Sequence, residues 1–521
     1  MPTREKAREA ARHVGVLLVN RIVITGLLLI LQLVWLFVLF SRLTAYVTWI
    51  NGICLAFSVL MCLFLIRKDS TAPEFKISWM VLFMLMPVQG GILYLMWGDK
   101  RPAIPLRRRL QRSADLLRPL HPADPTPQRR LEQQNARAAA TAAYLRDYGP
   151  YPVYNRTQVT YYPLGDDFYR DLLPALQAAE HFIFLEFFII SRGEMWDSIH
   201  DILREKAAAG VDVRLIYDDA GCASGLPAHY DRTLQAEGIQ ALPFNPVVPV
   251  LNVVMNNRDH RKIVVIDGHT AFSGGANLAD EYINRKERFG HWRDTAIRLH
   301  GEAVWSFTTM FLEFWNAHRR GPGDLSRFAP HAHHPEPFTG DGMVQPFSDS
   351  PVDRECVAKN VYLDLISQAQ QRLWITTPYL ILDNDTITAL SLAAKRGVDV
   401  HIYTPGIPDK PTIYLLTRSY FPPLIQAGVR IFSYTPGFLH SKTWLCDDRI
   451  AAVGSINLDY RSLYLHFECS TLLYDCSALA DIRADFRELE THCTPVMLQD
   501  CRTDFFGTLF AAILRMLAPL C

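Results

Sequence analysis

The chain contains the same short motif twice, and this repeat limits its possible folds more than any other feature. The first copy, HRKIVVID, covers residues 260–267 and is followed by GGAN at 274–277. The second copy, HSKTWLCD, covers residues 440–447 and is followed by GSIN at 454–457. Every matched position differs by 180 residues. A repeat of this length predicts that the chain contains two copies of one structural unit.

The segments upstream of the two motifs also match each other. In each, a helix-like stretch ends at a glycine, and a run rich in β-branched residues follows: GVDVRLIYDD from Gly210 and GVDVHIYTPG from Gly397. A helix, a glycine and then a strand-like run are typical of α/β units. The sequence therefore predicts two homologous α/β lobes, residues 151–325 and 350–521, joined by a polar linker at 326–349.

Residues 1–98 predict a membrane region, because they contain three runs without a charged residue, at 22–41, 43–66 and 77–98. Each run is long enough to cross a hydrocarbon core of about 30 Å. A basic juxtamembrane linker follows at 99–150, and positively charged flanks stay in the cytoplasm. We therefore expect a multi-pass protein of the cell membrane, with both lobes in the cytoplasm and the linker beside anionic headgroups.

Two apolar segments leave alternatives open. The arm before residue 22 is also basic, whereas three crossings would place it outside, so one of the three runs can instead be re-entrant or interfacial. Near the C-terminus, residues 505–520 read FFGTLFAAILRMLAPL. This segment predicts either a core helix or an amphipathic helix that lies on a lipid surface.

The charge balance and the cysteines narrow the classes of partner. The 53 Lys and Arg residues equal the 53 Asp and Glu residues, so a broadly basic nucleic-acid-binding surface is not expected. The ten cysteines show no CxxC pair and no Cys/His spacing of a zinc site. We expect reduced thiols and neither a metal site nor a nucleic-acid partner.

Each motif predicts a β-hairpin that turns directly after its aspartate. In the predicted register each lysine lies opposite the second residue of the GGAN or GSIN segment, and each histidine lies opposite its asparagine. Because residues two apart on a strand share a face with their cross-strand neighbours, one face of each hairpin carries a phosphate-sized set of polar groups. The two predicted sets are His260, Lys262, Gly275 and Asn277 in the first lobe, and His440, Lys442, Ser455 and Asn457 in the second.

The carboxylates near the motifs are expected to differ in role. Asp267 and Asp447 have the opposite parity to the histidines, so we expect them to act chiefly through the turn and its hydrogen bonds. A histidine that acts as nucleophile or proton carrier needs one nitrogen held by an acceptor. Asp294 and Glu468 are candidates for this orienting role, each for the histidine that precedes it in its own lobe.

The doubled HxK(x)4D(x)6G(G/S)xN pattern resembles the phospholipase D superfamily. Together with PVQGGILYLMWG at 87–98, FIFLEFFII at 182–190 and NLDYRSLYLHFE at 457–468, it makes nearly the whole chain similar to the bacterial cardiolipin synthases. The resemblance implies one pseudo-twofold site shared by both lobes. It implies catalytic His260, Lys262, Asp267, His440, Lys442 and Asp447, and phosphate contacts from Asn277, Asn457, Gly275 and Ser455, although Gly275 replaces the usual serine.

The resemblance also implies a reaction. Phosphatidyl transfer between two phosphatidylglycerol molecules would give cardiolipin and glycerol through a phosphatidyl-histidine, with no cofactor and no metal. By analogy His260 is the nucleophile and His440 the acid and base. The alternatives are phospholipase D hydrolysis, transfer to another alcohol, and a membrane scaffold with an inactive fold. Glu186 can serve either the site or the core, and the oligomeric state is not predicted.

Overall fold

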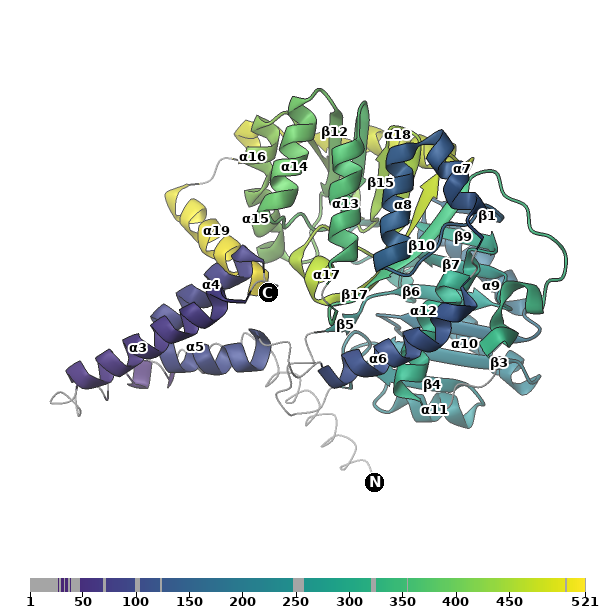
Figure 1. Cartoon of the computed structure of the whole chain (residues 1–521), viewed down its shortest axis with the longest axis horizontal. Coiled ribbons are helices and arrows are strands. Elements are labelled where there is room, and N and C mark those ends of the chain that lie inside the picture. The colour runs from purple at the N-terminus through teal and green to yellow at the C-terminus, as the bar shows by residue number, and fades with distance from the viewer. Residues whose placement is uncertain are drawn as a thin grey trace. The chain divides into compact units, whose positions relative to one another are not determined.

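The computed structural model describes residues 27, 30, 31, 33–35, 38 and 47–520, apart from 69–71, 99–103, 122–123, 247–256, 320–324, 354 and 502–503. The chain divides into two compact units (Figure 1). The first comprises residues 1–105, 245–256 and 512–521, and the second comprises residues 106–244 and 257–511. Both predicted lobes belong to the second unit, apart from the short segments 245–256 and 512–521.

The first unit contains one helix that is long and apolar enough to cross a membrane, among the described residues. This helix, α3 (Val47–Ile66), agrees with the span predicted at 43–66, and most of its large side chains are exposed. The run at 77–98 is instead divided between α4 (Pro73–Leu85), α5 (Pro87–Leu93) and a π-helical turn at Tyr94–Gly98. Proline at the start of α5 ends the preceding helix, because it has no N–H to donate.

The run at 22–41 lies largely outside the described residues, so the multi-pass topology remains a prediction. In the C-terminal helix α19 (Phe505–Leu517) no residue is buried. Phe505 is 75% exposed and Phe506 76% exposed. Leu509, Phe510 and Ile513 continue the same exposed stripe at helical spacing. The core-helix alternative is therefore wrong, and the interfacial alternative remains a prediction.

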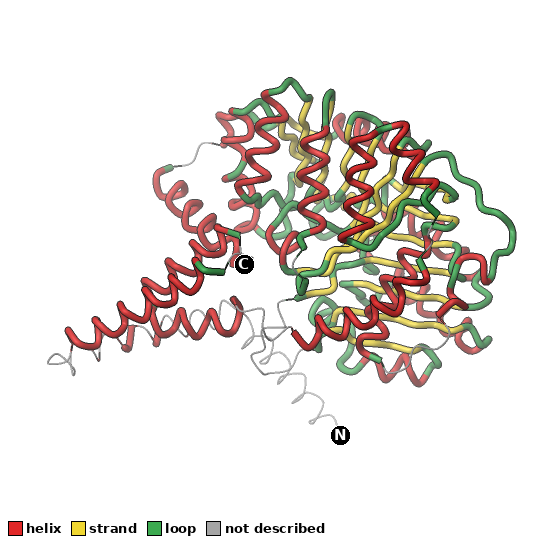
Figure 2. The backbone as a smooth tube through the Cα atoms, viewed as in Figure 1, coloured by secondary structure: helices red, strands yellow, loops and turns green. Residues whose placement is uncertain are grey.

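The first lobe is a seven-stranded sheet with helices on both faces (Figure 2). Its strands β2 and β6 lie near the centre, and their side chains are fully buried. The strand order is β1 (Thr157–Tyr162), β9 (Ala296–Gly301), β7 (Thr270–Gly274), β6 (Lys262–Ile266), β2 (Phe182–Phe187), β3 (Asp212–Asp218) and β4 (Gln240–Phe244). The helices are α9 (Gly165–Gln177), α10 (Glu194–Ala208), α11 (Tyr230–Ala236) and α12 (Val304–His318).

The second lobe repeats this strand order, which confirms the predicted pair of homologous α/β lobes. Its strands are β10 (Met343–Asp349), β17 (His466–Tyr474), β16 (Ile450–Gly454), β15 (Thr443–Cys446), β11 (Arg372–Thr376), β12 (Asp399–Pro405), β13 (Arg430–Tyr434) and β18 (Cys493–Pro495). Its helices are α13 (Val357–Gln368), α14 (Asn384–Lys395), α15 (Pro411–Ser419), α16 (Phe421–Gln426), α17 (Tyr460–Tyr464) and α18 (Ala478–Thr491). Strand β18 is an addition without a counterpart among the described strands of the first sheet.

The two predicted linkers contain regular structure. The segment 99–150 forms α6 (Ile104–Leu117), α7 (Thr126–Gln134) and α8 (Ala136–Tyr148). Helix α8 packs on the second lobe, where the Tyr144 hydroxyl donates to Glu355 at 2.6 Å. The linker at 326–349 ends earlier than predicted, because β10 begins at Met343. The charges and prolines of these segments predicted open linkers. In α8, however, the alanine-rich face is buried against the second lobe.

Candidate active site

Two short strands cross between the lobes and place the motif histidines. Strand β5 (Arg258–Asp259) of the first lobe pairs in parallel with β17 of the second. Strand β14 (Gly437–Leu439) of the second lobe pairs in parallel with β8 (His291–Arg293) of the first. The next residue after β5 is His260, and the next after β14 is His440. Each histidine therefore enters the site along a strand of the other lobe.

This exchange determines which carboxylate each histidine contacts. The His260 amide donates to the Phe467 carbonyl at 2.9 Å, and its Nδ1 lies 2.9 and 3.0 Å from the two carboxylate oxygens of Glu468. In the same way, the His440 amide donates to Arg293, and Nδ1 of His440 lies 2.6 Å from Asp294. Both carboxylates are fully buried.

The predicted pairing of each carboxylate with the histidine of its own lobe is therefore wrong. The reason is the parallel pairing of β5 with β17 and of β14 with β8, which brings the end of one lobe's strand beside the other lobe's histidine. A carboxylate at Nδ1 holds the proton there and leaves Nε2 with a lone pair. In both half-sites Nε2 is thus the nitrogen that remains free to accept a proton or to form a new bond.

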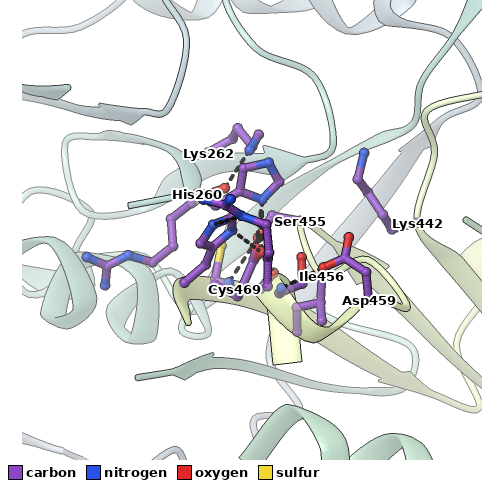
Figure 3. Close-up of polar contacts among 12 residues, drawn as sticks. His260, Lys262, Lys442, Ser455, Ile456, Asp459 and Cys469 are labelled. Atoms are coloured by element: carbon purple, nitrogen blue, oxygen red, sulfur yellow. Dashed lines mark hydrogen bonds and ion pairs between the residues drawn. The ribbon is translucent and has the colours of Figure 1, made fainter. Parts of the chain in front are cut away.

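The two motif lysines are buried beside the histidines. The ammonium of Lys262 donates to the His260 carbonyl, and that of Lys442 donates to the His440 carbonyl. Figure 3 shows Lys262, Ser455 and Cys469 grouped around His260. Burial lowers the pKa of Lys262 to about 8 and that of Lys442 to about 7. A bound anion would raise the pKa of both lysines, because negative charge favours their protonated form.

The two histidines are uncharged in this environment. Burial lowers the pKa of His260 well below its usual value, and the charges of Lys262 and Lys442 lower it further. Burial and Lys442 lower the pKa of His440 to about 4, although Asp294 opposes them. Because each lysine lowers the pKa of the other lobe's histidine, the two motifs form one electrostatic site.

The hairpin register differs by one residue from the prediction. Ile263 lies opposite Ser273, and Thr443 lies opposite Val453, so each hairpin turns through three residues rather than two. Asp267 and Asp447 adopt positive φ angles of 50° and 52° and begin these turns. The histidines lie outside the hairpins, since β6 begins at Lys262 and β15 begins at Thr443.

The asparagines follow β7 and β16 in loops and have different partners. The Asn277 amide oxygen accepts from the Ile189 amide at 3.0 Å, and its Nδ2 donates to the Tyr282 hydroxyl at 2.7 Å. The Asn457 oxygen is buried and has no hydrogen-bond partner among the described residues. Phosphate binding by either amide remains a prediction, and Asn277 has one N–H left for it.

Gly275 and Ser455 contact the carboxylates of their own lobes. A Cβ at Gly275 would lie 2.1 Å from Asp294 Oδ1, so the serine of the usual pattern would displace this carboxylate. The Ser455 hydroxyl donates to Glu468 Oε2. The predicted role of both residues as phosphate contacts therefore competes with their support of the two orienting carboxylates.

Asp267 and Asp447 anchor the hairpin turns to the neighbouring strand. The Asp267 carboxylate accepts from the amides of Glu180, His181 and Phe182, each at 2.8 Å. Asp447 accepts from the amides of Gln370, Gln371 and Arg372 at 2.7–2.9 Å. These bonds agree with the expectation that both aspartates act through the turn.

Two further groups around the site were not singled out by sequence reasoning. Arg261, between the two motif residues, contacts Glu186 and Asp259 and stacks on Phe314, so Glu186 belongs to a buried ion cluster under the site. His466 lies 5.5 Å from the His260 ring. The available signal for His466 was strand alternation, since it precedes Glu468 by two residues and shares its face.

One set of residues has the spacing of metal ligands. Ligand atoms of His260, His466 and Glu468 lie within 4.8 Å of one another. The set fits a metal poorly, because Arg461 Nε donates to His466 Nε2 and so requires the proton on Nδ1, which leaves that ring without a free lone pair. The lysine charges beside His260 also oppose a cation.

Comparisons with known proteins agree with this arrangement. A family model described as cardiolipin synthase, PLD-like domain, matches residues 172–296 and 362–490, once in each lobe. A phospholipase D-nuclease N-terminal model matches residues 55–98. The crystal structure of phosphatidylserine synthase from Haemophilus influenzae shares the fold, with a TM-score of 0.57 and 16% identity over 73% of this chain and 97% of that chain.

Curated relatives match most of the chain. An uncharacterized protein from Streptococcus mutans is 43% identical over 450 residues, which are 85% of this chain and 96% of that protein. A cardiolipin synthase from Geobacillus thermodenitrificans is 33% identical over 480 residues, which are 90% of this chain and 94% of that protein. On these matches and on its doubled domain, the chain belongs to the bacterial cardiolipin synthase family, phosphatidyltransferases of the phospholipase D superfamily.

Proposed function

We propose that the protein transfers a phosphatidyl group between two phosphatidylglycerol molecules and releases cardiolipin and glycerol. One observation carries the proposal: two buried histidines, one from each lobe, each have Nδ1 held by a carboxylate and lie in the field of the same two lysines. This symmetry suits a reaction in which one phosphorus atom exchanges two alcohols in two similar steps.

The first step is attack by His260 Nε2 on the phosphorus of the first phosphatidylglycerol. A P–N bond forms, the P–O bond to the glycerol headgroup breaks, and the departing oxygen takes from His440 Nε2 the proton that this nitrogen gains from water when the anionic phosphodiester binds, which leaves His440 neutral. Glu468 at Nδ1 balances the positive charge that His260 gains. The products of this step are glycerol and a phosphatidyl-histidine.

The second step reverses the first with a new alcohol. Neutral His440 takes the proton from a headgroup hydroxyl of the second phosphatidylglycerol, and that oxygen forms a bond to phosphorus. The P–N bond breaks and restores His260. The ammonium groups of Lys262 and Lys442 stabilise the negative charge on the phosphoryl oxygens in both steps.

The differences between the half-sites support His260 as the nucleophile. Burial and the two lysines lower the pKa of His260, and the Arg461 charge lowers it further, which keeps this imidazole free to attack. Asp294 raises the pKa of His440 against burial, and the negative charge of a bound phosphodiester raises it further. His440 is therefore the better proton donor once substrate is bound.

The test is to identify the lipid and alcohol products. The purified full-length protein in detergent, given phosphatidylglycerol alone, is expected to form cardiolipin and glycerol in equal amounts, measured by mass spectrometry. Phosphatidic acid without cardiolipin would establish hydrolysis instead. A product seen only with added serine or ethanolamine would establish another acceptor, and no turnover would favour a scaffold.

The two lysines predict that the rate falls at alkaline pH. They bind phosphate only when protonated, and burial lowers the pKa of Lys262 to about 8 and that of Lys442 to about 7. The value of kcat/KM is therefore expected to fall by at least about tenfold between pH 7 and pH 9. The fall in kcat should begin at higher pH, because bound phosphate raises the pKa of both lysines. Steady-state rates in mixed micelles measure both limbs, and a flat profile up to pH 9 would contradict this role.

The same proposal extends to location. We place the protein in the cell membrane with its lobes in the cytoplasm, supported by α3 and by the exposed arginines Arg108, Arg109 and Arg112 of α6. Basic side chains next to a membrane helix bind anionic headgroups. Phosphatidylglycerol is itself anionic, so the same residues would concentrate the substrate.

A further inference from the structure

The residue two positions before each orienting carboxylate differs between the half-sites. His466 lies opposite Arg258 where β17 pairs with β5, two residues before Glu468. Trp292 lies opposite Phe438 where β8 pairs with β14, two residues before Asp294. The carboxylate that holds His260 thus has an imidazole as its strand neighbour, whereas the carboxylate that holds His440 has an indole.

The contacts of His466 fix its tautomer. Arg461 Nε donates to His466 Nε2 at 3.2 Å, so the ring proton lies on Nδ1. Burial lowers the pKa of His466 to about 3, which keeps the ring neutral. The Nδ1 atom faces Glu468 Oε1 at 3.7 Å, too far for a hydrogen bond. It is buried and, among the residues described, has no hydrogen-bond partner.

Burying an N–H donor without an acceptor costs free energy. The Nδ1–H group of His466 would recover part of this free energy by moving a short distance towards the Glu468 carboxylate. Building on the proposed transfer, we propose that His466 is a positioning residue whose Nδ1–H closes on Glu468 and helps to keep His260 uncharged until it attacks phosphorus. Arg461 holds the ring in the tautomer that permits this contact. Glu468 would then be held by His260, Ser455 and His466 together.

The arrangement also keeps His260 ready to attack. Each donor on Glu468 draws carboxylate charge away from Nδ1 of His260, so the charged form of that imidazole is less favoured. Loss of the His466 donor is expected to raise the pKa of His260. The other charged or titratable groups that act on His260 are Lys262 of β6, Arg461 of α17, and His440 and Lys442 between β14 and β15.

The test compares two substitutions of His466 across pH. His466→Leu removes the donor, and about tenfold lower kcat/KM is expected at pH 5.5, with less than about threefold loss at pH 8. His466→Asn places an amide N–H near the position of Nδ1, and activity within about twofold of the unsubstituted protein is expected at both pH values. A structural role alone would lower the rate equally at all pH values.

A matched control exists in the second lobe. His401 is buried, and its Nε2 lies 2.8 Å from Arg430 Nε and 2.9 Å from Asp399. This is the same combination of arginine, histidine and carboxylate outside the site. His401→Asn is expected to leave the pH profile unchanged even where it lowers stability.

A second measurement needs no lipid. Diethyl pyrocarbonate modifies neutral imidazoles, and peptide mass spectrometry follows its rate at His260 as a function of pH. In His466→Leu this rate is expected to fall at pH 5.5 and to recover by pH 8, whether or not phosphatidylglycerol is turned over. The inference is overturned if the pH dependence at His260 is the same in both proteins, or if His466→Asn behaves as His466→Leu does.

Discussion

His440→Ala is expected to stop the reaction halfway and leave lipid phosphate on the enzyme. With a phosphatidyl p-nitrophenyl ester, whose leaving group needs no proton, the variant should release about one p-nitrophenolate for each His260. Turnover to cardiolipin should fall by roughly 10³- to 10⁴-fold, because no group then removes the proton from the second alcohol. Rapid-mixing absorbance measures the burst, and intact-protein mass spectrometry detects the phosphatidyl adduct.

His260→Ala is the matched variant, since it removes the equivalent ring from the other lobe. It is expected to show neither burst nor adduct, because the P–N bond cannot form. Peptide mapping of the trapped enzyme should place the adduct on His260. An adduct on His440 in the His260→Ala protein would exchange the two roles, and a burst without any adduct would exclude the covalent intermediate.

Much of the fold follows from the repeat. Matching the motifs at 260–267 and 440–447 predicts two lobes with one strand order, and the two sheets share that order from β1 to β4 and from β10 to β13. The additions to one lobe could not be predicted in this way. Strand β18 has no counterpart among the described strands of the first sheet, so comparison of the chain with itself contains no signal for it.

The residues of the site could be predicted from the sequence, whereas the strand pairing between the lobes and the hairpin register could not. The histidines and lysines can be recognised in the sequence, because their spacing is the same in both motifs. The exchange between lobes depends on β5 and β14, which are two and three residues long and too short to show an alternating pattern. The hairpin register was missed because Asp267 and Asp447 begin three-residue turns at positive φ.

The second large effect is expected from the orienting carboxylates, and it distinguishes the two possible pairings. Glu468→Gln removes the charge that stabilises His260 as it attacks, so it should slow the p-nitrophenolate burst by about 10²- to 10⁴-fold. Asp294→Asn acts on His440, which an activated leaving group does not need in the first step. It should leave the burst within about threefold and slow turnover to cardiolipin by about 10²-fold or more.

Double substitutions then show whether each carboxylate acts through the histidine across the lobe interface. Asp294→Asn is expected to add little to the turnover loss of His440→Ala, because the group that it orients is already absent. In the His260→Ala protein, Glu468→Gln should likewise cause no further loss of turnover to cardiolipin. Pairing within each lobe would give the opposite result, with the burst slowed by Asp294→Asn and preserved by Glu468→Gln. That outcome would contradict the exchange of β5 and β14 on which the shared site depends.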